Sequence, residues 1–239
     1  AELVARHLGM QHEVMIYEPE QLAALVPTAV WTLESFDEDC VSGALTNLFA
    51  SKLASEHTNC ILSGEGGDEL FGGYHLLKEL DCEHERLSMM ERLIEIAYNT
   101  ALQRLDRAMM GNGINYRTPF IDTRLIALAL QTPVSWKIWE QEDGEPIEKH
   151  ILREAFKDLL PESIYRRRKL RFAAGAGTDG LMDEVALQHA AVEFNEKTRH
   201  TDTGYELSSP KEMWYYQIFC ERFPAACFQT LVGRWDPDK

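Results

Sequence analysis

The chain has 239 residues, enough for one large domain or two small ones, and its 45% hydrophobic content excludes a wholly disordered protein. Its 24 basic and 39 acidic side chains give a formal net charge of −15, which argues against a protein that binds nucleic acid or an anionic membrane through a basic face. No apolar run approaches the ~18 residues that a bilayer-spanning helix needs, so we expect no membrane span.

The first 80 residues alternate between helical and strand-like patterns. Residues 1–9 begin inside a helical pattern, from which we expect a further element upstream of residue 1. Patterns further along predict a strand over 12–17, helices over 19–31 and 42–56, and a buried strand over 59–62. That last strand runs into a glycine-rich turn, with a new helix beginning near Asp68. This order predicts an α/β fold with a parallel sheet and crossover helices.

The remainder of the chain is predicted to be mostly helical. An apolar stripe predicts one long helix over 83–110, which ends at Gly111-Asn112-Gly113. Shorter helices are expected over 122–131, 146–160 and 179–195, and Ser209-Pro210-Lys211-Glu212 predicts the start of a helix that reaches about Arg222. We therefore expect a single domain over 1–239, with an α/β portion over 1–80 and a helical portion over 81–239.

Cysteine and histidine usage narrows the class of protein further. The five cysteines are an odd number without a C-x-x-C pair, so neither a disulfide framework nor a cysteine-rich zinc site is expected. With a charged amino end in place of a secretory signal, this usage predicts a cytoplasmic protein. Cys60, within an apolar run, is expected to be buried. The histidines form no H-E-x-x-H motif, and His12, His75 and His150 are expected to be packing or surface residues.

The densest candidate for a functional site is the glycine-rich segment over 63–74, which follows the strand expected at 59–62. Its glycines allow the backbone to approach a ligand closely, and the helix that begins there offers free N–H groups to an anion. The segment matches neither the P-loop nor the Rossmann pattern. Its acidic residues point to Mg²⁺ bridging to phosphates. An ordinary surface turn rich in Gly and Asp is the alternative.

Two basic segments and one extended segment follow. Five basic residues within 165–171 suit a polyanion as small as pyrophosphate, or form a solvated helix end. Lys149, on an amphipathic helix, either points into a site or pairs on the surface with partners such as Arg153. The segment over 116–122 is expected to be structural, because Pro119 favours an extended entry and Asp122 can cap the next helix.

Several motifs together resemble the asparagine synthase family. The core of the likeness is Leu62-Ser63-Gly64-Glu65-Gly66-Gly67-Asp68-Glu69-Leu70-Phe71-Gly72-Gly73-Tyr74. Four further segments match family motifs in the family's order: Arg117-Thr118-Pro119-Phe120-Ile121-Asp122, Glu148-Lys149-His150-Ile151-Leu152-Arg153, Leu160-Pro161-Glu162-Ser163-Ile164 and Lys169-Leu170-Arg171-Phe172-Ala173-Ala174-Gly175-Ala176-Gly177. The likeness covers most of residues 1–222 and implies a synthetase domain with an adenine-nucleotide α-hydrolase-like fold.

The resemblance implies a two-step, ATP-dependent ligase reaction. A substrate carboxylate attacks the α-phosphate of ATP to give an acyl-adenylate and pyrophosphate, and an amine then displaces AMP. The family's amine is usually ammonia that a separate glutaminase domain or subunit releases from glutamine. The carboxylate is a small molecule, with aspartate as one candidate, and the protein could form a homo-oligomer.

Residue roles follow from the matched motif positions. By resemblance, Asp68 is a Mg²⁺ ligand, and Ser63 and Gly64 line the AMP part of the ATP site. Glu65 matches the acid proposed to act as base for the incoming amine, and Lys149 and Lys169 match the lysines that hold pyrophosphate. A carboxylate near the adenylate can collect the nucleophile's proton, and lysines stabilise the charge on departing pyrophosphate.

Two departures from the family pattern leave alternatives open. The family's S-G-G-x-D-S loop is absent from these residues, as is the glutaminase domain. In the family the loop precedes the stretch that matches 1–17, so either it lies upstream or the chain is a catalytically incomplete nucleotide-binding or scaffolding relative. The other departure lies in 34–42: asparagine-forming members usually carry a threonine and an arginine near Asp39 and Ser42, where the substrate amino acid is held. An acid there would repel the carboxylates of aspartate.

Overall fold

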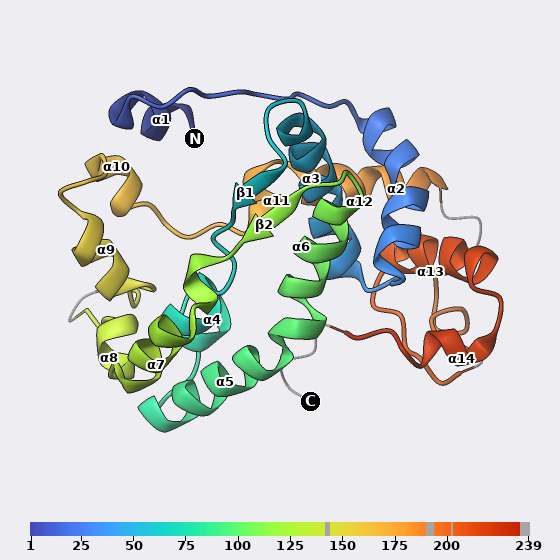
Figure 1. Ribbon diagram of the computed structural model, residues 1–239. Coiled ribbons are helices and arrows are strands. Elements are labelled where there is room, and N and C mark those ends of the chain that lie inside the picture. The colour runs from blue at the N-terminus through green and yellow to red at the C-terminus, as the bar shows by residue number, and fades with distance from the viewer. Residues whose placement is uncertain (142–143, 190–193, 202, 235–239) are drawn as a thin grey trace.

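Helices make up most of the chain, and one short parallel sheet lies among them (Figure 1). The computed structural model describes residues 1–141, 144–189, 194–201 and 203–234. In chain order the elements are α1 (Glu2–Leu8), α2 (Pro19–Leu33), α3 (Glu38–Ser55), β1 (Cys60–Leu62), α4 (Gly67–Phe71), η1 (His75–Lys78), α5 (Glu83–Ile96), η2 (Ala97–Asn99), α6 (Ala101–Met110), β2 (Asn115–Arg117), η3 (Pro119–Ile121), α7 (Thr123–Gln131), α8 (Val134–Lys137), α9 (His150–Phe156), α10 (Glu162–Tyr165), α11 (Phe172–Gly175), α12 (Thr178–His189), α13 (Pro210–Arg222) and α14 (Ala226–Gln229).

The sheet is parallel, as expected. β1 pairs with β2, with Cys60 opposite Asn115 and Leu62 opposite Arg117. Helices α4, α5 and α6 make the connection between the two strands, so the chain is a mixed α/β protein. β2 was not anticipated from the sequence. Two strands do not by themselves define the adenine-nucleotide α-hydrolase-like fold, which stays a prediction, as does the division at residue 80.

The prediction of a strand over 12–17 is wrong. This stretch is extended, as Figure 1 shows where the chain runs from α1 to α2, but it pairs with no strand that the structure describes. Val14 and Ile16 are 65% and 83% exposed. A strand needs a neighbour for its backbone hydrogen bonds and for one of its faces, and alternation in a single segment supplies neither.

The prediction that the strand over 59–62 is buried is also wrong. Cys60 is exposed and Leu62 is 76% exposed, with only Ile61 of β1 packed against a core cluster. The apolar run predicted the strand correctly but not what covers it. A run of this kind is typical of a strand covered on both faces, and the described residues cover only part of this one.

The largest core cluster lies where α2, α3, α12 and α13 pack together. α3 is buried continuously from Cys40 to Leu48, so it is a central helix rather than an amphipathic surface helix. Phe36, fully buried just before α3, makes edge-on ring contacts at about 5 Å with Tyr205, Tyr216 and Phe219. Those contacts join the carboxyl-terminal part of the chain to the first helices.

The long helix expected over 83–110 is two helices. The break is at Thr100, whose backbone leaves the helical region (φ −125°, ψ −99°) and whose hydroxyl donates to the Ile96 carbonyl at 3.0 Å. α5 packs Met90 and Leu93 against Leu77 and Ile138, whereas α6 packs against α3. The apolar stripe therefore serves two separate cores, and one straight helix could not face both.

Helix boundaries elsewhere are mostly as expected. The stop at Gly111-Asn112-Gly113, the cap by Asp122 and the start of α13 are confirmed. α9 is shorter than the expected 146–160 helix, because Ile147 bridges to Trp139 and Lys149 adopts a left-handed conformation (φ 54°). Of the helix expected over 179–195, α12 accounts for the residues to His189, and 190–193 lie outside the described residues. Among the described helices none is long and apolar enough to cross a bilayer.

Replacing Ser209 with alanine is expected to cost about 1 kcal/mol of unfolding free energy. The Ser209 hydroxyl accepts the Glu212 amide at 3.0 Å and donates to Glu38, so its loss leaves the first turn of α13 with an unpaired N–H. Chemical denaturation of Ser209→Ala and wild type measures the difference. Ser55→Ala, an exposed serine at the end of α3, is the matched control and should change stability by less than about 0.5 kcal/mol.

Candidate functional site

The glycine-rich segment forms a tight turn from β1 into α4. Its first residue is tied to the sheet, because the Ser63 amide donates to the Arg117 carbonyl at 2.8 Å. The Ser63 hydroxyl in turn accepts the Glu65 amide at 3.3 Å. Gly66 has φ +92°, and a Cβ there would lie 2.8 Å from the Ile121 side chain. The turn therefore requires glycine, and it places Glu65 and Asp68 at the carboxyl end of β1.

Asp68 contacts both lysines that the sequence singled out. Its Oδ1 lies 2.8 Å from Lys149 Nζ, and its Oδ2 lies 3.3 Å from Lys169 Nζ. Lys149 immediately precedes α9, and Lys169 lies in the loop between α10 and α11. All three side chains are between 22% and 25% exposed, so they are reachable from solvent. The structure thus brings together three predicted residues from distant parts of the sequence.

A buried carboxylate holds the two lysines in place. Glu148 Oε1 accepts the Lys169 amide at 3.0 Å, and the carboxylate also pairs with Lys78 and Arg153. Its side chain is only 5% exposed, and these partners lower its pKa against the opposing effect of burial. Because Lys149 is the next residue, one carboxylate fixes the backbone at both lysines. The motif resemblance contained Glu148, but sequence reasoning assigned it no role.

Glu65 forms an ion pair with Arg104, a residue that none of the sequence motifs contains. The Glu65 Oε1 to Arg104 nitrogen distance is 3.3 Å, and the other guanidinium nitrogen lies 3.5 Å from Asp39. Burial raises the pKa of Glu65, with Arg104 opposing that rise and Glu69 and Asp68 adding to it. Arg104 lies among the buried residues Ala101, Leu105 and Ala108 of α6. A charged residue on that apolar face was the signal in the sequence that Arg104 has a buried partner.

Glu69 and Tyr74 form a separate pair beneath the turn. The Tyr74 hydroxyl donates to Glu69 Oε1 at 2.6 Å, and Glu69 is 4% exposed. Burial, with the neighbouring carboxylates, raises the pKa of Tyr74, which keeps the phenol protonated as the donor. This pair supports α4 from inside, so of the acids in the turn only Glu65 and Asp68 face the accessible side.

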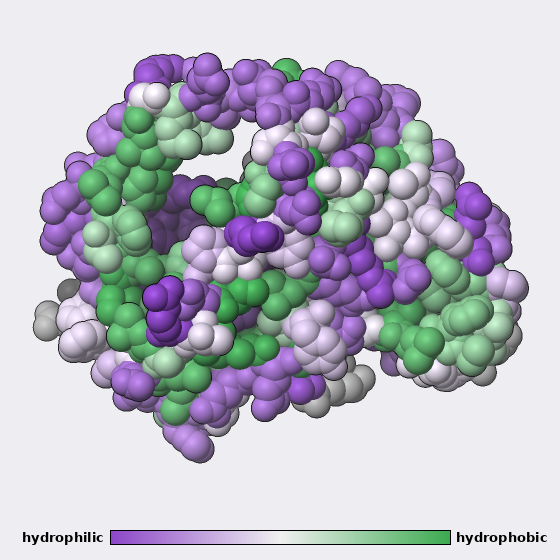
Figure 2. Space-filling model, viewed as in Figure 1, coloured by the Kyte–Doolittle hydropathy of each residue, from purple (hydrophilic) through white to green (hydrophobic). Residues whose placement is uncertain are grey.

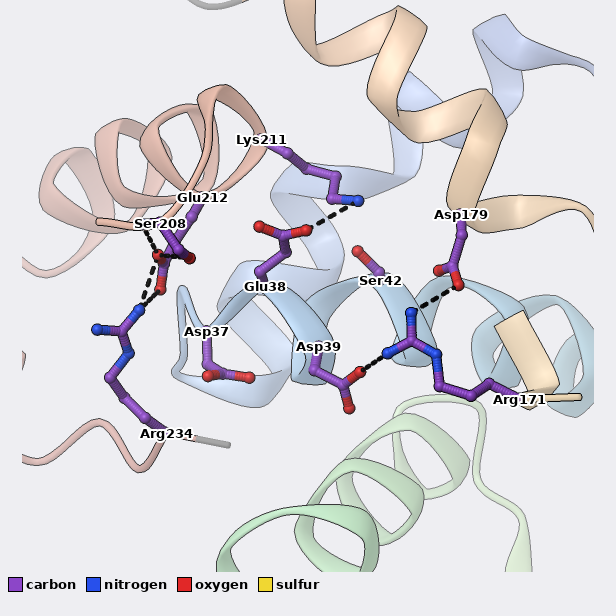
Figure 3. Close-up of a pocket in the computed structure, with 10 residues that line it drawn as sticks. All are labelled: Asp37, Glu38, Asp39, Ser42, Arg171, Asp179, Ser208, Lys211, Glu212 and Arg234. Carbon is purple, nitrogen blue, oxygen red and sulfur yellow. Dashed lines mark hydrogen bonds and ion pairs between the residues drawn. The ribbon is translucent and has the colours of Figure 1, made fainter. Parts of the chain in front are cut away.

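A charged pocket of about 260 Å³ lies beside the ion pair of Arg104 with Asp39, and Asp39 lines it (Figure 3). Arg171 bridges Asp39 at 2.8 Å and Asp179 at 3.1 Å. The other lining residues come from around the start of α3, around the start of α13 and the segment after α14: Asp37, Glu38, Ser42, Ser208, Lys211, Glu212 and Arg234. Asp39 is thus paired with both Arg171 and Arg104. Its expected repulsion of a carboxylate ligand is correspondingly weaker than the sequence alone indicated.

The space-filling view shows an opening through the molecule (Figure 2). Comparison with Figure 1 places it between α10, β1 and the extended segment that joins α1 to α2. Exposed apolar side chains lie on the bordering strand and on α9 next to α10, including Leu62 at 76% and Phe156 at 46%. This side of the sheet is therefore more open than the side that packs against the core.

The donor set fits a magnesium ion held jointly with phosphates. Asp68 Oδ1 is buried and, apart from its ion pair with Lys149, accepts no hydrogen bond. In the described part of the chain no three His, Cys, Asp or Glu side chains are grouped as a metal site. Mg²⁺ characteristically takes one or two carboxylates and completes its shell with water and substrate phosphates. Asp68 suits that arrangement, with the two lysines as further partners for phosphate oxygens.

Comparisons with known proteins agree with the motif likeness. The family model described as asparagine synthase matches residues 1–97 and 83–225. The chain is 29% identical to a glutamine-hydrolyzing asparagine synthetase of Bos taurus, 30% to that of Gallus gallus and 28% to that of Homo sapiens, each over 254 aligned residues. These alignments cover 99% of this chain and 43% of each relative. The chain thus spans less than half the length of the relatives it matches.

Proposed function

The chain belongs to the asparagine synthase family, and we propose that it carries the synthetase site of an ATP-dependent amide ligase that forms AMP and pyrophosphate. In this proposal a small-molecule carboxylate attacks the α-phosphate of ATP, and ammonia or another amine displaces AMP from the acyl-adenylate. Glutamine is the proposed source of ammonia, through a glutaminase domain or subunit, because the relatives are named glutamine-hydrolyzing asparagine synthetases.

The contact of Asp68 with Lys149 and Lys169 is the observation that carries this proposal. Breaking the α–β bond of ATP leaves pyrophosphate with charge that must be stabilised as it develops. Two lysines at one accessible carboxylate match that need, because phosphate oxygens can take over the lysine contacts that Asp68 makes without ligand. Glu148 keeps both lysines in position during this exchange.

Asp68 would hold Mg²⁺, whose charge would offset part of the negative charge on the phosphates. Ser63 and Gly64 are proposed to line the AMP part of the site. A Cβ at Gly64 would meet no atom within 4 Å, so the backbone there is open to a ligand. Glu65 is proposed as the base that takes a proton from the attacking amine. Burial raises the pKa of Glu65, which makes its carboxylate a stronger base.

The test is a product analysis of the native full-length protein with ATP, Mg²⁺, ammonium and a panel of small carboxylic acids. Equal amounts of AMP and pyrophosphate should form only when a productive acid is present. Hydroxylamine in place of ammonium should trap the activated acid as a hydroxamate. ATP binding without turnover for every acid would instead favour the non-catalytic relative.

Replacing Gly73 with alanine is expected to lower the rate of pyrophosphate release about 10-fold, since misplaced catalytic groups cost factors of this order or more. A Cβ at Gly73 would lie 1.8 Å from Asp68 Oδ1 and 2.4 Å from Lys149 Cε, so the ion pair must separate. Gly180→Ala, where a Cβ meets nothing within 4 Å, is the control and should leave the rate unchanged. Equal rates in both variants would show that the Asp68–Lys149 geometry does not matter.

A further inference from the structure

The Arg104 guanidinium occupies a position that is costly for the fold to provide. It lies in α6, is 16% exposed, and reaches across to α3 and to the glycine-rich turn. Gly43, in the middle of α3, makes room for it: a Cβ there would lie 2.7 Å from Arg104 Nη1 and 2.8 Å from its Cδ. Glycine inside a helix is unfavourable relative to alanine, so the close approach of the arginine explains an otherwise unfavourable residue.

We propose that Arg104 is a positioning residue for Glu65, which it holds toward the site, and that Asp39 fixes Arg104 in turn. This inference rests on the proposed function, because it assigns Arg104 to the amine-transfer step. The contacts that carry it are the 3.3 Å pair of Arg104 with Glu65 and the 3.5 Å pair with Asp39. Two nitrogens of one guanidinium thus contact two carboxylates, one in α3 and one in the glycine-rich turn.

The charges around Glu65 determine the expected pH dependence. Arg104 faces it from α6, Glu69 and Asp68 face it from α4, and the Tyr74 hydroxyl lies beyond Glu69. Asp39 and Cys40 of α3 face the guanidinium, and burial raises the pKa of Cys40 to about 12, so that thiol is neutral. Arg104 is the cation that opposes burial and the two acids in setting the pKa of Glu65.

Removing the positive charge should therefore raise the pKa of Glu65 further, because Arg104 lowers it against the effects of burial and the neighbouring acids. Glu65 acts as a base only when ionised, so the acidic limb of the pH–rate profile for amide formation should move to higher pH. In Arg104→Gln we expect that limb to shift up by about 1 unit or more, with the rate of pyrophosphate formation unchanged. Arg104→Lys should restore most of the profile because it keeps the charge.

The control is Arg107→Gln on the same helix. Arg107 pairs with Glu34 and the Leu33 carbonyl, away from Glu65, and this variant should keep the wild-type profile. If Arg104→Gln does not fold, Gly43→Ala tests the same contact, because it displaces the guanidinium without changing the charge. It should shift the limb in the same direction by a smaller amount.

The outcomes separate this inference from the proposed function. A uniform loss of rate at every pH in Arg104→Gln, or an unmoved limb, would overturn the positioning role while leaving the ligase proposal intact. If Glu65→Gln itself had no effect on amide formation in a protein that forms pyrophosphate, the assignment of Glu65 would fail first. A shifted limb, restored by lysine and absent in Arg107→Gln, supports the inference.

Discussion

Asp68→Asn should lower ATP cleavage to AMP and pyrophosphate by roughly 100- to 1,000-fold, the effect expected when a charged group that stabilises a developing phosphate charge is lost. The substitution keeps the shape of the side chain but removes the charge that would hold Mg²⁺. It also removes the charge that aligns Lys149 and Lys169, whose Nζ atoms lie 2.8 and 3.3 Å from its two oxygens. Pyrophosphate release under saturating ATP and Mg²⁺ measures the loss.

Asp183→Asn provides the matched control for this result. Asp183 also pairs with a lysine, with its Oδ1 2.7 Å from Lys211 Nζ, but its side chain is 66% exposed and it contacts none of the proposed catalytic residues. The same change of charge there should leave turnover near the wild-type value. If Asp68→Asn cleaved ATP at the wild-type rate, the proposed roles of this carboxylate in metal and phosphate binding would be wrong.

Glu65→Gln should separate the two steps of the reaction. Formation of pyrophosphate in the first turnover should stay near the wild-type rate, whereas amide formation should slow about 100-fold, the usual contribution of a positioned general base. The amide side chain keeps the size of Glu65 and can still contact Arg104, but it cannot accept the proton that the attacking amine must lose. Rapid-quench measurement of pyrophosphate and amide in one reaction provides both rates.

A control variant guards against a general effect of removing an acidic group. Glu154→Gln, in α9, breaks an exposed ion pair with Lys157 and should change neither step. A Glu65→Gln protein that slowed both steps equally would point to a structural role for Glu65. One that slowed neither would remove Glu65 from the mechanism.

Local signals predicted the helical elements well, because they depend on nearby residues. The proline and serine at the start of α13 and the aspartate before α7 predicted those helix starts correctly. The strand expected over 12–17 was wrong because pairing depends on a second segment, which alternation in one segment cannot report. The prediction of one long helix over 83–110 was wrong because the apolar stripe of that segment packs against two different cores.

The site was predictable only to the extent that its residues lie in recognisable motifs. Asp68, Lys149 and Lys169 were named from such motifs, and the structure brings them into contact. Arg104 lies in no motif, and a helical pattern cannot tell which acid a buried arginine will meet. Likewise, Glu148 was visible in a motif, but its bond to the Lys169 amide depends on tertiary structure.

The wide separation along the sequence of Asp68, Lys149 and Lys169 has a consequence for folding. Their contacts close long loops, whose entropic cost must be met before the ion pairs form, so the cluster assembles only when most of the chain is already in place. A ligand that bridges all three recognises the native state alone. Its binding therefore adds to global stability by mass action, by about 2.7 kcal/mol at a free concentration 100 times its dissociation constant.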